Sequence, residues 1–369
     1  MSNPLVRLGG LGQSPWLDFI TRDLLNSGEL QRMIEQDGLR GMTTNPTIFE
    51  KAVSESETYD AEIRELSEQG LAPSRIFETI AVADVQKACD IFRPVYDATH
   101  GQDGYVSLEV SPDFAYDADA TVREARRLWS AVGRPNAMIK IPGTAPGLLA
   151  VEKCVSLGFN INITLLFSVE RYERVIDAYF AGLQSRLVRN MPLDRLASVA
   201  SFFVSRVDSK IDPLLDRLGT QEARALRGTI AIANAQVAYE RFEHAFRGST
   251  WRVLARKGAR PQRPLWASTS TKDPTYSDVH YVEPLVAPST VNTLPPETMA
   301  AYRDHGDPAP RLPERIPDAR EKLDRLKALG IDLEEITTAL EKEGVAKFAA
   351  SFSALLNVVD AKAAQLSRV

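Results

Sequence analysis

The sequence predicts an α/β fold, a single parallel (β/α)8 TIM barrel. Short apolar segments rich in β-branched residues alternate along the chain with longer segments whose apolar residues recur at helical spacing. Eight short segments of this kind can be counted, and eight is the number of parallel strands that closes such a barrel. An open doubly wound sheet is the alternative, but no Gly-x-Gly-x-x-Gly motif follows an early strand.

Each expected strand is a short apolar run bounded by polar or turn-forming residues. In chain order the eight runs cover Pro15–Ile20, Leu39–Thr43, Tyr105–Val110, Ala137–Ile141, Asn160–Phe167, Ser198–Val204, Pro264–Ser268 and Tyr281–Ala287. The strands of the barrel are therefore expected within about residues 15–290.

Helices are expected in the intervals between these strands. One apolar stripe at helical spacing consists of Phe77, Ala81, Val85, Ala88 and Phe92. After the fifth strand, Ser168 is well placed to cap a helix that runs through Tyr172 and Tyr179. A further apolar stripe consists of Leu226, Ile230, Ala233 and Val237.

Two regions contain more helix than a minimal barrel needs. The first is about residues 50–100, and the second follows a Pro-rich passage after the last strand, with helices at about 317–328, 333–343 and 345–367. Asp332, with Glu335 three residues later, resembles a capping box at the start of one of them. Because residues 295–369 are few for an independent core and carry apolar stripes, we expect them to pack on the barrel, so that residues 1–369 form one domain.

Composition and charge indicate which partners, metals and cellular location to expect. The chain of 369 residues has a net charge of −5 and no block of lysine and arginine, which makes nucleic acid an unexpected partner. The two cysteines and four histidines show no spacing typical of a metal site, so a structural metal is not expected. The first residues do not resemble a leader peptide, and no run approaches the roughly 18 apolar residues of a membrane span, which favours a cytoplasmic protein.

Polar residues occur near the carboxyl ends of seven of the eight expected strands, where barrels carry their functional side chains. In strand order they are Asp18; Thr43, Thr44 and Asn45; Glu109; Lys140; Asn162 and Thr164; Ser201 and Arg206; and the segment Ser268 to Lys272. Each has a structural alternative: Asp18 and Asn45 could cap helices, hydroxyls could satisfy backbone groups, and the cations could be solvated. Their joint occurrence at strand ends favours one common cavity.

Lys140 is the most informative of these residues. It lies in the apolar run Ala137–Ile141, so its amine should be removed from water unless its stem alone is buried. Desolvation disfavours the ammonium ion and lowers the pKa of a lysine, and a neutral amine can attack a carbonyl carbon to form a Schiff base. The sequence therefore predicts an amine nucleophile at the end of the fourth strand.

The neighbouring residues suit Schiff-base cleavage of a carbon–carbon bond in a ketose. Glu109, through a water held by Thr164, could move the protons needed when the carbinolamine loses water. Asp18 could remove the hydroxyl proton whose loss triggers the cleavage. Asn45 and Ser201 could bind hydroxyls, while Arg206 and Lys272 could hold a phosphate by charge-assisted hydrogen bonds.

At these residues the chain resembles the transaldolase family, in particular its long bacterial branch, some members of which are fused to glucose-6-phosphate isomerase. The resemblance extends from about residue 14 to about residue 295, in family order. The motifs that carry it are Trp16-Leu17-Asp18, Thr43-Thr44-Asn45-Pro46-Thr47-Ile48-Phe49, Ser107-Leu108-Glu109-Val110, Ile139-Lys140-Ile141-Pro142-Gly143-Thr144, the run Asn160 to Ser168, and Ser201-Phe202-Phe203-Val204-Ser205-Arg206.

The resemblance implies a barrel of the class I aldolase type that transfers a dihydroxyacetone unit between sugar phosphates, sedoheptulose 7-phosphate and glyceraldehyde 3-phosphate giving erythrose 4-phosphate and fructose 6-phosphate. By the same resemblance Lys140 carries the Schiff base, Asp18 is the acid/base, and Glu109 and Thr164 hold the catalytic water. Substrate-binding roles fall to Asn45, Asn162, Ser201, Arg206 and Ser268, and the resemblance implies no cofactor or metal. Many relatives have an arginine after the seventh strand, where this chain offers Lys272.

Other functions are compatible with the same residues. A fructose-6-phosphate aldolase-like lyase would release free dihydroxyacetone, although the bulky Phe203 could exclude water and favour transfer. A barrel that only binds sugar phosphates has no need of a buried amine. A homodimer is a further hypothesis that the sequence leaves open.

Overall fold

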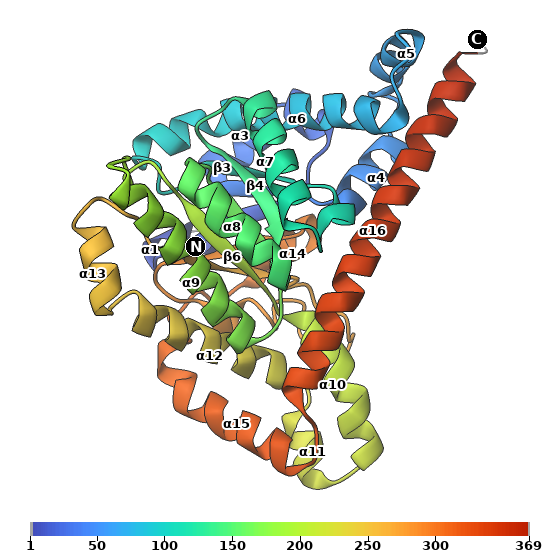
Figure 1. The fold of residues 1–369 in the computed structure, drawn as a ribbon. Coiled ribbons are helices and arrows are strands. Elements are labelled where there is room, and N and C mark those ends of the chain that lie inside the picture. Colours follow the sequence, from blue (N-terminus) through green and yellow to red (C-terminus); the bar gives the residue numbers. More distant parts are fainter. Residues whose placement is uncertain (1–2, 368–369) are drawn as a thin grey trace.

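The computed structural model describes residues 3–367 and confirms the predicted barrel (Figure 1). Eight parallel strands pair in chain order, and the first also pairs with the eighth, which closes the sheet. The strands are β1 (Gln13–Asp18), β2 (Gly41–Thr43), β3 (Tyr105–Glu109), β4 (Ala137–Pro142), β5 (Ile161–Leu166), β6 (Ser198–Phe203), β7 (Arg263–Ala267) and β8 (Thr290–Leu294).

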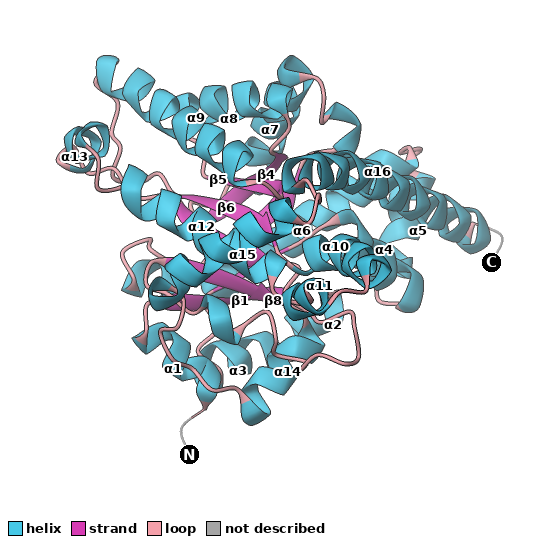
Figure 2. Cartoon of the chain, turned by 90° about the horizontal axis from the view of Figure 1, so that it is seen from below, coloured by secondary structure: helices cyan, strands magenta, loops and turns pink. Residues whose placement is uncertain are grey.

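Helices surround the strands on all sides (Figure 2). They are α1 (Pro4–Gly10), α2 (Arg22–Asn26), α3 (Glu29–Gln36), α4 (Pro46–Glu55), α5 (Asp60–Glu68), α6 (Pro73–Ala98), α7 (Ala118–Val132), α8 (Ala145–Leu157), α9 (Val169–Val188), α10 (Ser205–Leu218), α11 (Gln221–Leu226), α12 (Ile230–Ala245), α13 (Ser249–Ala255), α14 (Pro296–His305), α15 (Ile316–Ala328) and α16 (Leu333–Leu366). Short 3-10 turns cover Pro112–Phe114, Glu283–Leu285 and Pro313–Arg315. The extra helices predicted within residues 50–100 are α4, α5 and α6.

The predicted position of the eighth strand was wrong. Residues Tyr281–Ala287 form loop and a 3-10 turn, and β8 lies further along the chain at Thr290–Leu294. The loop resembles a strand because Tyr281, Val282 and Leu285 are buried under the surrounding helices. The true strand was missed because its buried residues include Thr290, Asn292 and Thr293, whose polar side chains resemble a loop.

The two helices predicted at about 333–343 and 345–367 are one continuous helix, α16. Asp332 caps its start, since the side chain accepts hydrogen bonds from the backbone N–H groups of Glu334 and Glu335. Figure 1 shows α16 crossing the edge of the barrel, and it contacts α4, α5, α6 and α10. By length and mean hydropathy alone α16 could cross a membrane, but polar side chains interrupt its apolar residues, so no unbroken apolar run of about 18 residues occurs in it. Its contacts with the barrel bury 28% of the most apolar window of this helix.

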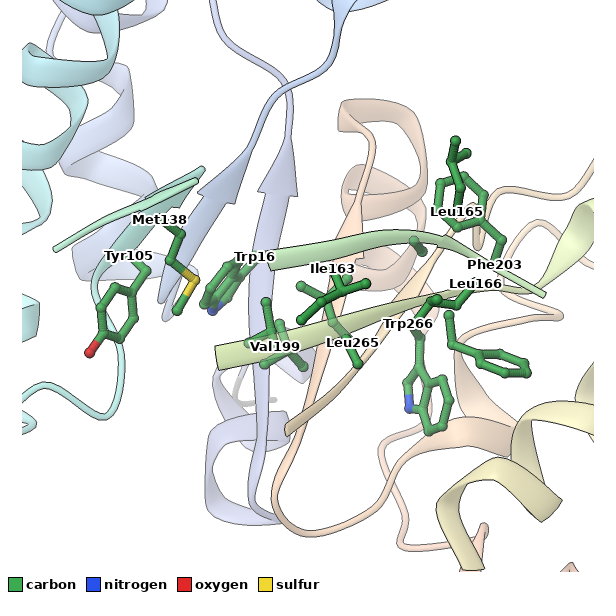
Figure 3. Packing of buried hydrophobic residues seen from close by; sticks show 14 of the residues in the cluster. Trp16, Tyr105, Met138, Ile163, Leu165, Leu166, Val199, Phe203, Leu265 and Trp266 are labelled. Carbon is green, nitrogen blue, oxygen red and sulfur yellow. The ribbon is translucent and has the colours of Figure 1, made fainter. Parts of the chain in front are cut away.

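Buried apolar side chains from several strands pack together in the barrel (Figure 3). Trp16, Met138, Val199 and Leu265 lie on four different strands and are buried. Because side chains alternate along a strand, Asp18, Lys140 and Ser201 lie on the same faces two residues further on. The apolar layer therefore forms the floor of a site at the carboxyl ends of the strands.

Candidate functional site

A cavity of about 370 Å³ opens at the carboxyl ends of the strands. Eight of the ten residues predicted for the site line it, namely Asp18, Asn45, Lys140, Thr164, Ser201, Arg206, Ser268 and Lys272. Glu109 and Asn162 lie behind this lining and contact members of it. The barrel thus brings together side chains that lie up to 254 residues apart in the sequence, from Asp18 to Lys272.

Lys140 and Glu109 form a buried ion pair in the wall of this cavity. They are register partners on β4 and β3, so both side chains leave the sheet on the same face. Lys140 Nζ lies 3.3 Å from Glu109 Oε2, and each side chain is only 4% exposed. The amine also donates a hydrogen bond of 3.0 Å to the Thr44 carbonyl oxygen. The predicted burial of the amine is therefore confirmed, and its head does not reach solvent.

The carboxyl group of Glu109 has a strongly altered acidity. Burial raises its pKa to about 7, and the nearby Lys140 only partly opposes this effect. Within residues 3–367, neither carboxylate oxygen accepts a hydrogen bond, and the buried Thr164 hydroxyl has no partner either. Buried polar groups are usually hydrogen-bonded, so these atoms are suited to hold a bound water or a substrate group.

Asp18 lies at the end of β1, on the opposite side of the lumen from β4 and β5. Its carboxylate accepts a hydrogen bond of 2.7 Å from the hydroxyl of its register partner Thr43. Burial raises the pKa of Asp18, whereas the positive charges of Lys140 and Arg206 oppose this. Asp18 does not cap the next helix, because that position is taken by Thr21. Its carboxylate is therefore available at the cavity.

Asn162 and Ser201 belong to one hydrogen-bonded chain across the lumen. The Asn162 amide donates to the Ser107 hydroxyl at 3.0 Å, and its carbonyl accepts from the Ser201 hydroxyl at 2.7 Å. Asn162 is fully buried, so only Ser201 of the pair faces the cavity. In this arrangement Asn162 orients Ser201.

Asn45 both caps a helix and faces the cavity, the two roles between which the sequence did not decide. It is the N-cap of α4, where its side-chain oxygen accepts a hydrogen bond of 3.1 Å from the Ile48 N–H. It also lines the cavity. The cap fixes the side chain. Its amide nitrogen donates no hydrogen bond to another described residue, so it is available to a ligand.

The cations Arg206 and Lys272 lie at the mouth of the cavity near Ser268. The Arg206 guanidinium stacks over the Phe203 ring at 5.1 Å. Burial lowers the pKa of Arg206, and the carboxylate of Asp18 opposes this effect. Ser268 adopts a positive φ of 54° and lies 3.0 Å from the Ser205 hydroxyl, while Lys272 donates to the Ser270 hydroxyl at 2.7 Å. This cluster of cations and hydroxyls suits an anion.

Several cavity residues were not predicted from the sequence. The most informative are Lys51 on α4, Glu297 on α14, and Lys347 and Phe348 on α16. The Phe348 ring lies 5.8 Å from Lys140 Nζ, so the C-terminal helix covers the amine. Phe348 was recognised only as part of an apolar stripe. No local signal indicated where that stripe would pack.

Comparisons with known proteins agree with this geometry. The family model described as "Transaldolase/Fructose-6-phosphate aldolase" matches residues 15–359. The chain is 47% identical to a protein of Frankia alni named "Transaldolase", covering 100% of this chain and 99% of that one. It is 48% identical to a "Transaldolase" of Acidothermus cellulolyticus over 97% and 96% of the two chains. It is also 46% identical to "Transaldolase 2" of Nostoc punctiforme, over 100% of both.

Proposed function

Because the chain belongs to the transaldolase/fructose-6-phosphate aldolase family and matches transaldolases over its full length, it is a transaldolase, and we propose that it acts through a Schiff base on Lys140. The observation that carries this proposal is the buried contact of 3.3 Å between Lys140 and Glu109 in the wall of the cavity. A buried ammonium ion beside a carboxylate whose pKa is about 7 can pass its proton to that carboxylate.

The proposed reaction begins with attack of the neutral Lys140 amine on the C2 carbonyl of sedoheptulose 7-phosphate. The carbinolamine then loses its hydroxyl as water, for which Glu109 supplies the proton. Thr164 faces the same cavity with a hydroxyl that has no other partner in the described chain. Its proposed role is to hold the water that connects Glu109 to the reacting carbon.

Carbon–carbon cleavage needs a base on the opposite side of the substrate. Asp18 takes the proton of the C4 hydroxyl, the C3–C4 bond breaks, and erythrose 4-phosphate leaves as an aldehyde. The three-carbon unit remains on Lys140 as an enamine. It then attacks the aldehyde carbon of glyceraldehyde 3-phosphate, Asp18 returns the proton to the new hydroxyl, and hydrolysis of the Schiff base releases fructose 6-phosphate.

Binding groups surround this path. Asn45 and Ser201 are proposed to bind hydroxyls of the dihydroxyacetone unit, with Asn162 holding Ser201 in place. Arg206, Ser268 and Lys272 are proposed to hold the phosphate. Lysine provides a point charge and not the bidentate fork of an arginine, so Arg206 contributes the directional contacts.

Transfer must be distinguished from release, because the family includes aldolases as well as transaldolases. Phe203 supports transfer: it lines the cavity, is 6% exposed and packs against Phe167 with ring centroids 5.2 Å apart. A bulky apolar wall limits the access of water to the enamine.

The experiment follows the fate of the three-carbon unit from fructose 6-phosphate. We expect sedoheptulose 7-phosphate to form rapidly when erythrose 4-phosphate is present, with free dihydroxyacetone below roughly one percent of that rate. Release of dihydroxyacetone at a similar rate, with or without an acceptor, would identify a lyase. Binding of fructose 6-phosphate without any turnover would identify a barrel that only binds sugar phosphates.

The cellular setting remains a proposal. Transaldolases are metabolic enzymes that act on sugar phosphates, and we propose that this one acts in the non-oxidative pentose phosphate pathway in the cytoplasm. The homodimer stays a prediction that sedimentation equilibrium can test.

A further inference from the structure

We propose that the C-terminal helix α16 supplies a phosphate-binding residue, Lys347, which binds the phosphate of the sugar together with Arg206. This inference rests on the proposed function and deepens it. It assigns to the last helix a part in recognising phosphorylated substrates, beyond covering the barrel.

The packing of α16 against the barrel fixes the position of Lys347. Gly344 packs so closely on β5 that a Cβ atom there would lie 3.0 Å from Leu165 Cδ2 and 3.6 Å from Phe167. One turn later, Lys347 and Phe348 both line the cavity, and Phe348 lies over the Lys140 amine. The glycine therefore permits the close approach that brings both side chains to the mouth of the site.

The charge around Lys347 is that of a site for an anion. Lys51, Arg206, Lys272 and Lys347 all line the cavity, and within residues 3–367 none of them has a carboxylate oxygen within 4.0 Å. Two other charged residues of α16 do have partners, since Glu343 pairs with Lys210 at 2.6 Å and Lys362 pairs with Asp60 at 2.7 Å. Four cations without a carboxylate partner among the described residues therefore line one cavity, where the substrate would bind.

The charge of Lys347 interacts with those of Arg206 and Lys272, the two cations proposed to hold the phosphate. Its pKa is lowered first by the positive charge of Arg206 and then by burial and by Lys272. Such repulsion is relieved when a dianionic phosphate binds between the cations. Lys51 lines the same cavity from α4 but does not contribute to this effect. Lys347 therefore lies beside Arg206 and Lys272, the two cations proposed to hold the phosphate.

The test compares phosphorylated and unphosphorylated acceptors in a Lys347→Met variant. In a ping-pong reaction, kcat/KM for the acceptor reports only on the second half-reaction. We expect kcat/KM for erythrose 4-phosphate to fall about tenfold and that for erythrose to change less than twofold, as for loss of one charge-assisted contact. The inhibition constant of inorganic phosphate should rise by a similar factor, and Lys347→Arg should restore most of both values.

The matched control is Lys342→Met, which removes a lysine of the same helix that is exposed and outside the cavity. It should leave both acceptors unaffected. Equal losses for erythrose and erythrose 4-phosphate in Lys347→Met, or unchanged values for both, would overturn the inference. Trapping of the donor on Lys140 in the wild-type protein tests the proposed function separately, so that failure of one is not mistaken for failure of the other.

Discussion

Glu109 and Lys140 contact each other because β3 and β4 run in parallel with these residues in register. The pair is removed from water, and the contact has different consequences for its members. Lys140 donates a hydrogen bond to the Thr44 carbonyl oxygen and lies 3.3 Å from the Glu109 carboxyl group. Glu109 has no other partner among the described residues, and burial raises its pKa to about 7. A carboxyl group that titrates at neutral pH can both donate and accept a proton during turnover.

This raised pKa predicts a dependence of stability on pH. Between the ordinary value of 4.5 and about 7, Glu109 is ionised in the unfolded chain but remains protonated in the folded one. Stability therefore falls as the pH rises through this window. In Glu109→Gln this contribution is absent. From pH 4.5 to 7 the free energy of unfolding of the wild type should therefore fall by about 3 kcal/mol relative to that of the variant.

Urea titrations of both proteins at several pH values measure this difference. Asp208 also has a pKa raised to about 7 by burial, but it is present in both proteins and cancels in the comparison. A difference between the two proteins that stays constant over the window would mean that Glu109 ionises normally in the fold. Transfer activity of Glu109→Gln should be at least about a hundredfold lower, because proton movement at the carbinolamine is lost.

At the scale of elements, α16 is the feature that the sequence analysis described least well. Gly344 lies between the two helices that were predicted, where a glycine is typical of a helix end. In the fold it serves as a contact surface within one helix, against Leu165 and Phe167. The difference between these two roles depends on tertiary packing, which local sequence does not contain. The same limit applies to Lys347, whose neighbours come from α10 and the loop after β7.

A Gly344→Leu substitution should move α16 away from the barrel without unfolding it. The added side chain cannot fit against Leu165, and overpacking of this kind typically costs about 1–3 kcal/mol. Displacement of Phe348 and Lys347 should lower kcat/KM for erythrose 4-phosphate roughly tenfold or more. Ala350→Leu, at an exposed position on the same helix, is the control and should retain the wild-type value. Equal activity of both variants would show that the close packing of α16 on the barrel is not needed for activity.

At the scale of the whole molecule, alternating strands and helices and polar strand ends were sufficient to predict the barrel and its functional edge. The alternation recurs along the whole barrel, polar residues mark seven of the expected strand ends, and both signals come from local sequence. β8 was misplaced because its residues are polar on both faces yet fully buried: Thr293 meets Thr43 in the lumen, and Asn292 meets Thr269. Its burial comes from closure of the barrel between β1 and β7, which is a long-range property.

Closure of the barrel also depends on the space left by a glycine in β2. Gly41 is the register partner of Trp16, and a Cβ atom at this position would lie 2.5 Å from the indole ring. Trp16 is completely buried and cannot move aside. Gly41→Ala should therefore reduce the free energy of unfolding by about 1–3 kcal/mol.

The matched control is Gly9→Ala in α1, where an added Cβ meets nothing within 4 Å. Alanine favours a helix over glycine, so this variant should be unchanged or more stable by up to about 1 kcal/mol. Thermal unfolding followed by circular dichroism compares the two. A Gly41→Ala protein as stable as Gly9→Ala would show that Trp16 is not confined as the structure implies.

The central claim is that Lys140 holds the three-carbon unit, and borohydride reduction during turnover tests it most directly. With fructose 6-phosphate present, reduction should inactivate the protein and add one stable three-carbon adduct, which peptide mass mapping places on Lys140. Lys140→Met, which lacks the amine, should acquire no adduct at the active site. An adduct on a different lysine, or full activity after reduction in the presence of substrate, would contradict the account.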